Sequence, residues 1–231
     1  MDRIEVVNAV LEHVGGDGVY LEIGVQRGDA FRRVRAPVRI GVDPKFGDAT
    51  LWAMARLGPL RARFGPQSGQ FLFSCTSDQF FRTRRKLLGR SPLACVLVDG
   101  LHTADQAFRD IGNSLEFLGE RGVIVVHDCN PQSEWAALPT LGMAFRHPEF
   151  TGEWNGDVWK AIVRLRATRS DLRICVLDCD QGIGLVRTGE PEVPLALSEA
   201  AVDALTYLDL DTNRGALLNL RPAEHLAEFL A

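Results

Sequence analysis

The stretch Val19-Tyr20-Leu21-Glu22-Ile23-Gly24-Val25-Gln26-Arg27-Gly28 decides which fold class this sequence predicts. It begins as a short, mostly apolar strand and ends in a glycine turn, and a helical segment follows it. Glycines at such a turn let the backbone bend tightly and approach a ligand closely. A strand, a glycine turn and a helix in this order are typical of the first unit of a parallel α/β sheet.

Four further apolar runs have the length of strands, and helical patterns separate them; they cover residues 38–43, 71–76, 94–98 and 123–126. Continuous apolar strands between helices indicate a parallel sheet with helices on both faces. Residues 172–178 and 182–187 predict two more strands, and their short connection favours an antiparallel hairpin. The sequence thus predicts an α/β fold with a mostly parallel, seven-stranded sheet that ends in this hairpin.

Length and composition predict one domain spanning residues 1–231, with 46% hydrophobic and 24% charged residues. Within it we expect a lead helix at 1–14, a substrate-side insert at 130–160 and a helical tail at 198–231. The formal net charge of −4 argues against a nucleic-acid partner. No apolar run reaches membrane-spanning length and the N-terminus does not resemble a signal peptide, so we expect a cytoplasmic protein without a membrane partner.

The turn after the first strand predicts an adenosyl-type cofactor site. Glu22, Gly24 and Gly28 form an acidic-x-Gly-x-x-x-Gly pattern, and the dinucleotide pattern G-x-G-x-x-G is missing. Asp43 closes the second predicted strand, where a carboxylate can accept hydrogen bonds from both hydroxyls of a ribose.

Polar residues also follow the fourth and fifth predicted strands: Asp99 and His102 after the fourth, and His127, Asp128 and Asn130 after the fifth. The carboxyl ends of parallel strands meet at one edge of a sheet, so these side chains converge. Carboxylate and imidazole groups suit Mg²⁺ or Mn²⁺, and a neutral imidazole can accept a proton from a hydroxyl. Metal ligation and ordinary turn positions both remain open.

The segment from Trp154 to Lys160 predicts a substrate wall with polar contacts from Asp157 and Lys160. A core tryptophan and a helix cap explain the same pattern, and both interpretations remain open.

With these motifs, the sequence resembles the class I (Rossmann-like) S-adenosylmethionine-dependent methyltransferases over roughly residues 15–190. The glycine loop, the acidic end of the second strand and the terminal hairpin carry the resemblance. It implies that Glu22, Gly24 and Gly28 border the methionine part of the cofactor and that Asp43 binds its ribose. The remaining implied cofactor contacts are Ser77, Asp78 and Asp99.

Four segments narrow the resemblance to a bacterial branch of small-molecule and sugar O-methyltransferases: TSDQFF at 76–81, VDGLHTADQAFRDI at 98–111, GVIVVHDCNP at 122–131 and WNGDVWKA at 154–161. The branch implies metal ligation by Asp99, His127 and Asp128, with Asn130 as an alternative third ligand. It also implies His102, Asp99 and Asp128 as catalytic residues. The substrate contacts that we expect are Asn130, Trp154, Asp157 and Lys160.

The predicted function is therefore methyl transfer from S-adenosylmethionine to a hydroxyl of a small molecule, either a sugar or a natural-product scaffold. We expect a divalent metal to assist and His102 to act as general base, and we allow for a homodimer. Two alternatives remain: an NAD-dependent oxidoreductase on a Rossmann fold, against which the glycine pattern argues, and a non-catalytic cofactor-binding subunit.

Overall fold

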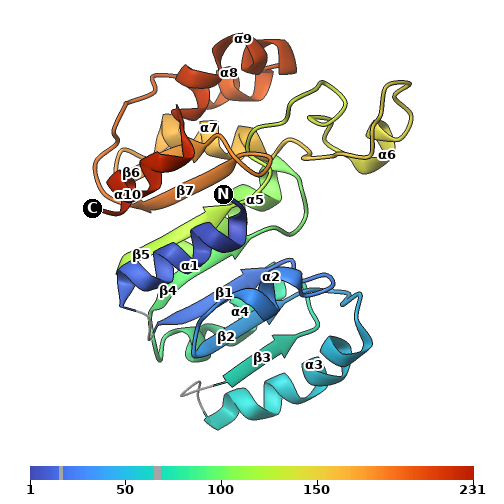
Figure 1. Ribbon diagram of the computed structural model, residues 1–231, viewed down its shortest axis with the longest axis vertical. Coiled ribbons are helices and arrows are strands. Elements are labelled where there is room, and N and C mark those ends of the chain that lie inside the picture. Colours follow the sequence, from blue (N-terminus) through green and yellow to red (C-terminus); the bar gives the residue numbers. More distant parts are fainter. Residues whose placement is uncertain (16–17, 65–68) are drawn as a thin grey trace. The chain divides into compact units, whose positions relative to one another are not determined.

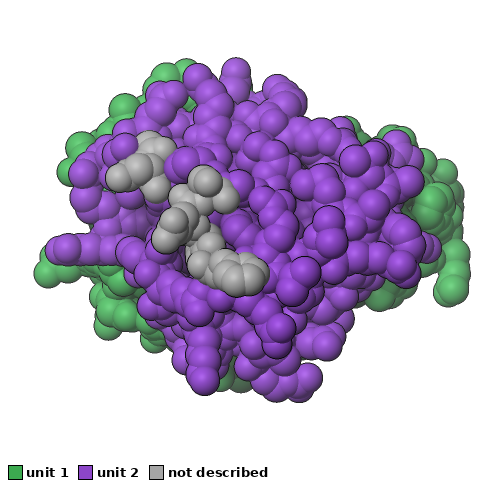
Figure 2. Space-filling view, turned by 90° about the horizontal axis from the view of Figure 1, so that it is seen from below, with its two compact units in different colours: residues 1, 101–109, 126–231 green, residues 2–100, 110–125 purple. Residues whose placement is uncertain are grey.

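The structure is a computed structural model that describes residues 1–15, 18–64 and 69–231. The chain divides into two compact units, which Figure 2 distinguishes by colour. Unit 1 comprises residues 1, 101–109 and 126–231, and unit 2 comprises residues 2–100 and 110–125. The single domain expected over residues 1–231 stays a prediction.

Unit 2 contains five strands in the order β3-β2-β1-β4-β5. Their bounds are β1 (Val19–Ile23), β2 (Val38–Val42), β3 (Gly69–Phe73), β4 (Leu93–Val98) and β5 (Leu118–Val126), of which the last residue falls in unit 1. The pairs β1–β2, β1–β4 and β2–β3 are parallel. The strand order reverses between β1 and β4, and open α/β sheets bind their ligands at the carboxyl ends of strands at such a reversal.

Every residue of β1 and β4 is buried, which requires cover on both faces of the sheet. The helices of this part of the chain are α1 (Arg3–Val14), α2 (Asp29–Arg33), α3 (Ala49–Arg61), α4 (Ser77–Leu88) and α5 (Ala104–Leu115). Helix α1 packs against β4, and α3 packs against β3 (Figure 1). The predicted lead helix begins with a capping box, in which Asp2 and Glu5 bond each other's backbone N–H groups.

Helix α3 and the short 3₁₀ turn Ala62–Phe64 were not expected from the sequence. The helix begins at the cap Asp48, whose side chain accepts a hydrogen bond from the Leu51 N–H. It buries only Leu51, Ala55 and Gly58 and contains Pro59. Because so few residues of this helix are buried, its apolar residues do not repeat at clear three- and four-residue steps, and the sequence did not indicate a helix here.

Unit 1 contains the predicted antiparallel hairpin, formed by β6 (Leu172–Leu177) and β7 (Ile183–Thr188). The short strand β8 (Leu220–Arg221) pairs parallel to β6. The described residues therefore form eight strands where the sequence predicted seven, because a two-residue strand carries no detectable alternation. The predicted α/β fold with a mostly parallel sheet and a terminal antiparallel hairpin is confirmed.

The insert predicted at 130–160 has little regular structure before its end, apart from the short helix α6 (Leu141–Ala144). Helix α7 (Val158–Thr168) follows and packs against β6. The tail contains α8 (Glu199–Ala204), α9 (Tyr207–Leu218), the 3₁₀ turn Ala223–His225 and α10 (Leu226–Leu230). Arg166 of α7 holds the tail by donating to the carbonyl oxygens of Ala216 and Leu217, both at 2.6 Å.

Across the residues that the structure describes, no helix is both long enough and apolar enough to cross a lipid bilayer.

Candidate functional site

The loop that follows β1 in unit 2 depends on its glycines. Gly24 has φ +91°, and a Cβ atom there would lie 1.9 Å from the carbonyl oxygen of Asp99. Gly28 has φ +81°, and its Cβ atom would lie 2.6 Å from a methyl group of Leu51. At Gly24 the backbone conformation and the neighbouring backbone both exclude a side chain, and at Gly28 the positive φ angle disfavours one.

Asp43, at the end of β2, holds this loop from the side. Its Oδ2 accepts a hydrogen bond from the Gln26 N–H at 2.8 Å, and its Oδ1 accepts one from the Lys45 N–H at 2.7 Å. Each carboxylate oxygen has two lone pairs, so Asp43 retains acceptor capacity for ligand hydroxyls beyond these two bonds.

Glu22 lies inside β1 and is 1% exposed. The Tyr20 hydroxyl donates a hydrogen bond to its Oε2 at 2.6 Å. Burial in the sheet raises the pKa of Glu22 to about 8, with a smaller contribution from the negative charge of Asp99. Burial therefore favours the protonated form of this side chain, in contrast to the carboxylate that the sequence motif suggests.

Ser77 and Asp78 occupy the first turn of α4, and the N-cap of that helix is Thr76, whose side chain accepts a hydrogen bond from the Gln79 N–H. A carboxylate in the first turn is stabilised by the helix dipole. Asp99 follows β4; its N–H donates to the carbonyl oxygen of Ile23 at 2.9 Å. These positions are at or near strand ends, as the sequence predicted.

His102 in unit 1 is held by its neighbours on two sides. Its ring stacks on the ring of Trp154, with centroids 5.0 Å apart, and its Nδ1 lies 3.4 Å from the Trp154 carbonyl oxygen. The same Nδ1 lies 3.2 Å from Oδ2 of Asp128. The side chain of His102 keeps 22% of its surface exposed, so a ligand can reach it.

Asp128 follows β5 with φ +64°, a conformation that non-glycine residues seldom adopt and that often marks functional sites. Its Oδ1 accepts a hydrogen bond from Nδ2 of Asn155 at 2.8 Å, and its Oδ2 lies 3.0 Å from Nδ1 of His127. Asn155, which is 1% exposed, was considered from the sequence only as a helix cap. Its position between Trp154 and Gly156 was the only local signal.

The turn of the β6–β7 hairpin completes this polar cluster within unit 1. Asp180 Oδ1 lies 3.6 Å from Nε2 of His127, and Gln181 Oε1 accepts a hydrogen bond from Asn155 at 3.2 Å. Both turn residues have positive φ angles, +43° and +64°. Asp180 and Gln181 were not predicted as site residues, because their sequence is that of an ordinary hairpin turn.

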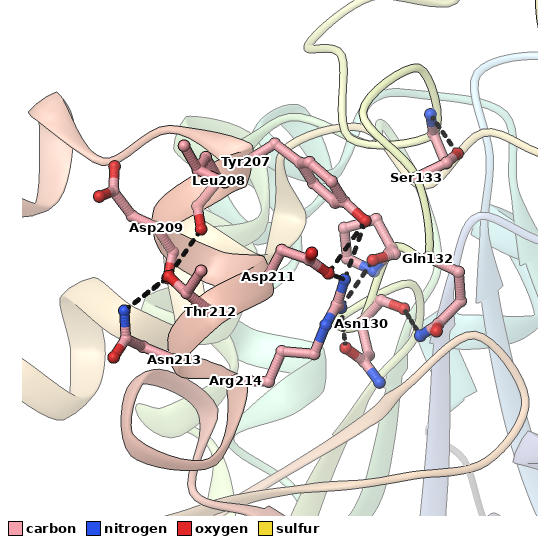
Figure 3. A network of polar contacts seen from close by, with 12 residues as sticks. Asn130, Gln132, Ser133, Tyr207, Leu208, Asp209, Asp211, Thr212, Asn213 and Arg214 are labelled. Atoms are coloured by element: carbon pink, nitrogen blue, oxygen red, sulfur yellow. Dashed lines mark hydrogen bonds and ion pairs between the residues drawn. The ribbon is translucent and has the colours of Figure 1, made fainter.

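The side chain of Asn130, a predicted substrate contact, is hydrogen-bonded to other residues of the protein. It is 2% exposed; its Oδ1 accepts a hydrogen bond from Nη1 of Arg214 at 2.6 Å, and its Nδ2 donates to Oδ1 of Asp178 at 3.1 Å. Figure 3 shows the contact between Asn130 and Arg214. The side chain of Asn130 therefore connects the end of β5 to the hairpin and to the tail.

Asp157 is the N-cap residue of α7, but its side chain makes no bond to that helix. Its Oδ1 accepts a hydrogen bond from the N–H of Ala104 at 2.7 Å instead. Asp157 and Lys160 also line a cavity, whereas Trp154 contacts His102. Of the predicted substrate contacts, Asp157 and Lys160 therefore lie at a cavity, whereas Trp154 positions His102.

Comparisons with known proteins agree with this fold. Residues 21–129 match a family described as "Methyltransferase domain". Cofactor-bound Rv0187 from MTB matches with a TM-score of 0.53 at 13% identity, covering 82% of each chain. TomG, an O-methyltransferase from Streptomyces achromogenes involved in tomaymycin synthesis and solved in complex with SAM, matches with a TM-score of 0.51 at 16% identity, covering 80% of this chain and 79% of that one.

CalS11, a TDP-rhamnose 3'-O-methyltransferase of calicheamicin biosynthesis, matches with a TM-score of 0.51 at 12% identity, covering 81% of this chain and 79% of that one. No curated protein matches the chain in sequence. At such low identities, the three structures establish the fold.

The family match covers the glycine loop, Asp43, Asp99 and the end of β5. It favours the predicted transferase over the oxidoreductase alternative. Residues 21–129 of this chain are similar to a methyltransferase domain, and the chain shares its fold with the solved O-methyltransferases named above.

Proposed function

We propose that the protein transfers the methyl group of S-adenosylmethionine to a hydroxyl of a small molecule, a sugar or a natural-product scaffold, with His102 as general base. The observation that carries the proposal is the pairing of His102 with Asp128. Two acceptors, the Asp128 carboxylate and the Trp154 carbonyl, lie beside Nδ1 of His102. They favour the tautomer that is protonated at Nδ1, which leaves Nε2 to accept the substrate proton.

The cofactor binds at the loop of unit 2 in this proposal. The glycine loop allows close approach, and Asp43 accepts hydrogen bonds from the ribose hydroxyls. The full proposed set of cofactor contacts is Glu22, Gly24, Gly28, Asp43, Ser77, Asp78 and Asp99. The cofactor supplies an electrophilic methyl group on its sulfonium.

A divalent cation is proposed to assist, with Asp99, His127 and Asp128 as ligands. The donor chemistry of unit 1 fits such an ion, because Asp128 lies within 3.2 Å of two imidazole rings and Asp180 lies 3.6 Å from His127. Carboxylates and imidazoles are ligands of Mg²⁺ and Mn²⁺. Such an ion would lower the pKa of a bound hydroxyl and so help its deprotonation.

Two of the fold neighbours reported above are O-methyltransferases by name, and this supports a hydroxyl as the acceptor. The acceptor contacts proposed in unit 1 are Trp154, Asp157 and Lys160, whereas Asn130 acts through its bonds to the tail. Catalysis depends mainly on placing the hydroxyl in line with the methyl group, and His102 removes the proton.

A direct test incubates the protein with S-adenosylmethionine, Mg²⁺ and a collection of hydroxylated small molecules. Mass spectrometry should detect a product heavier than its acceptor by one CH₂ group. Calorimetry with S-adenosylhomocysteine should show binding to the same protein. Stabilisation by NAD(H) in its place, with no methylated product, would contradict the proposal.

A further inference from the structure

Unit 1 contains a cavity of about 210 Å³. Three segments line it: residues 134–139 of the insert, residues 157–160 at the start of α7, and residues 205–207 at the start of α9. We call it the α7 cavity. The sequence did not predict that residues 205–207 of the tail would line a cavity beside α7.

The tail wall of the α7 cavity is fixed in place by Arg214. Its Nη1 donates hydrogen bonds to Oδ1 of Asn130 at 2.6 Å and to the carbonyl oxygen of Pro131 at 2.7 Å. Its Nη2 donates to the hydroxyl of Tyr207 at 3.0 Å and pairs with Asp211 at 2.7 Å. Figure 3 shows the guanidinium between these groups. Helix α9 is thereby bound to the segment after β5, and Tyr207 forms a stable wall.

The α7 cavity adjoins the segment that holds the proposed base. Trp154 stacks on His102, and a Cβ atom on Gly156 would lie 1.8 Å from the His102 carbonyl oxygen. Asp157 lines the cavity and also bonds the N–H of Ala104, two residues after His102. A ligand in the cavity therefore lies against the same short segment that positions His102.

The lining of the cavity combines flat apolar surfaces with polar groups of both signs. Tyr207 and the side chain of Leu138 offer apolar contact, whereas Trp159 borders the cavity but is itself only 1% exposed. Lys160 is a donor, whereas Asp157 and Glu134 are acceptors. A sugar ring has C–H faces that pack on aromatic rings and hydroxyls that both donate and accept. Two carboxylates beside one ammonium group disfavour a phosphate.

The size of the cavity restricts its occupant. Pockets for drug-sized ligands measure roughly 300–1,000 Å³. The α7 cavity, at about 210 Å³, suits a single ring.

We propose that the α7 cavity binds a neutral hexose-type ring of the acceptor, with Lys160 as hydrogen-bond donor to its hydroxyls and Tyr207 as part of its wall. This inference rests on the proposed function, since it names the part of the acceptor that the protein recognises. The tail thus contributes to acceptor selection.

The test is saturation-transfer NMR with methyl glycosides of common hexoses and 6-deoxyhexoses, in the presence of S-adenosylhomocysteine. The variant Ala137→Trp fills the cavity. The matched control is Gly142→Trp, on α6 of the same insert, where an added Cβ atom meets no neighbour within 4 Å. We expect sugar signals from the wild type and from Gly142→Trp, and their loss in Ala137→Trp. Retained signals in Ala137→Trp, or no glycoside signal from the wild type, would overturn the proposal.

A second pair of variants keeps the test decisive if Ala137→Trp fails to fold, as judged by its thermal melt. Lys160→Met should weaken glycoside binding about tenfold, because it removes a charged hydrogen-bond donor. Lys86→Met, on an exposed position of α4, should leave it unchanged. Equal affinity in Lys160→Met and the wild type contradicts the inference.

The two proposals fail in different ways. If the inference is wrong but the proposed function is right, Ala137→Trp still methylates its hydroxyl acceptor. If the proposed function is wrong, the wild type methylates no hydroxyl at all.

Discussion

The carboxylate of Asp157 accepts a hydrogen bond from the backbone N–H of Ala104 at 2.7 Å, so the cap residue of α7 caps the start of α5 instead. The two residues are far apart in sequence. The bond satisfies one of the N–H groups that the first turn of α5 leaves without a helical partner. It also fixes the chain just after His102.

Removing this cross-helix cap should destabilise unit 1. We expect Asp157→Ala to lower the free energy of unfolding by about 1 kcal/mol, the usual effect of losing a cap. Asp157→Asn keeps an acceptor oxygen and should lose much less. Urea unfolding followed by circular dichroism measures both. Equal losses in the two variants would show that the charge, rather than the hydrogen bond, is responsible.

Gly156 should be needed for the position of His102. It has φ +67°, and a Cβ atom would lie 1.8 Å from the His102 carbonyl oxygen, so Gly156→Ala must displace one of the two segments. We expect turnover to fall at least about tenfold, since small displacements of a catalytic group are costly. Gly152→Ala is the control: its φ is +100°, but no atom lies within 4 Å of the added Cβ. A similar loss in both variants would assign the effect to backbone strain alone.

His102→Ala should abolish proton removal and leave cofactor binding intact. Loss of a general base lowers turnover by about 10²- to 10⁴-fold. Calorimetry with S-adenosylhomocysteine should give the wild-type affinity. His147→Ala is the matched control, because its ring also stacks on a tryptophan, Trp135, with centroids 5.2 Å apart. Wild-type turnover in the His102 variant excludes the assignment.

Glu22 should make the protein less stable as the pH rises. The pKa of this carboxyl is about 8 in the folded protein, compared with the ordinary value of 4.5 that we take for the unfolded chain. The protonated carboxyl therefore makes its full contribution to the free energy of unfolding below about pH 4.5. This contribution decreases as the pH rises toward 8, by up to about 1.4 kcal/mol per pH unit. Besides its partner Tyr20, the charges of Asp99 and Arg3 act on it.

The variant Glu22→Gln cannot ionise and isolates this contribution. Urea unfolding of both proteins at several pH values between 5 and 8 should show that the wild type loses stability relative to the variant as the pH rises. A constant difference between the two proteins would mean that Glu22 titrates near its ordinary pKa.

Chelation should reveal whether a cation assists. We expect EDTA to lower turnover at least about tenfold, and Mg²⁺ or Mn²⁺ to restore it, because a bound cation acidifies the substrate hydroxyl. Cofactor affinity, measured in parallel, should change little. Full activity in EDTA would remove the metal from the proposal and leave His102 as the sole source of deprotonation.

The strands that carry the fold were predictable because each has a local pattern. The buried strands β1 and β4 appear as apolar runs, and Gly24 marks the turn that follows the first. Helix α3 was missed because its buried stripe is narrow and contains Pro59 near its end. Strand β8 was missed because two residues form no pattern.

The candidate site was only partly predictable. His102 and Asp128 were identified because polar residues follow apolar strands, and the structure places them 3.2 Å apart. Asn155 and Gln181 were not identified, although both belong to the same network. The neighbours of Asn155, Trp154 and Gly156, indicated only a helix cap, and Gln181 has the local sequence of an ordinary hairpin turn.

The sequence by itself determined the strands β1 to β7, the glycine loop and the side chains that end the strands, since these depend on periodicity and on backbone preferences of single residues. Only the tertiary structure decided which polar groups pair. Asp157 bonds Ala104, and Asn130 bonds Arg214 of the tail. Such pairs join residues distant in the chain, and because an unpaired buried polar group is costly, burial favours whichever partner the fold brings close.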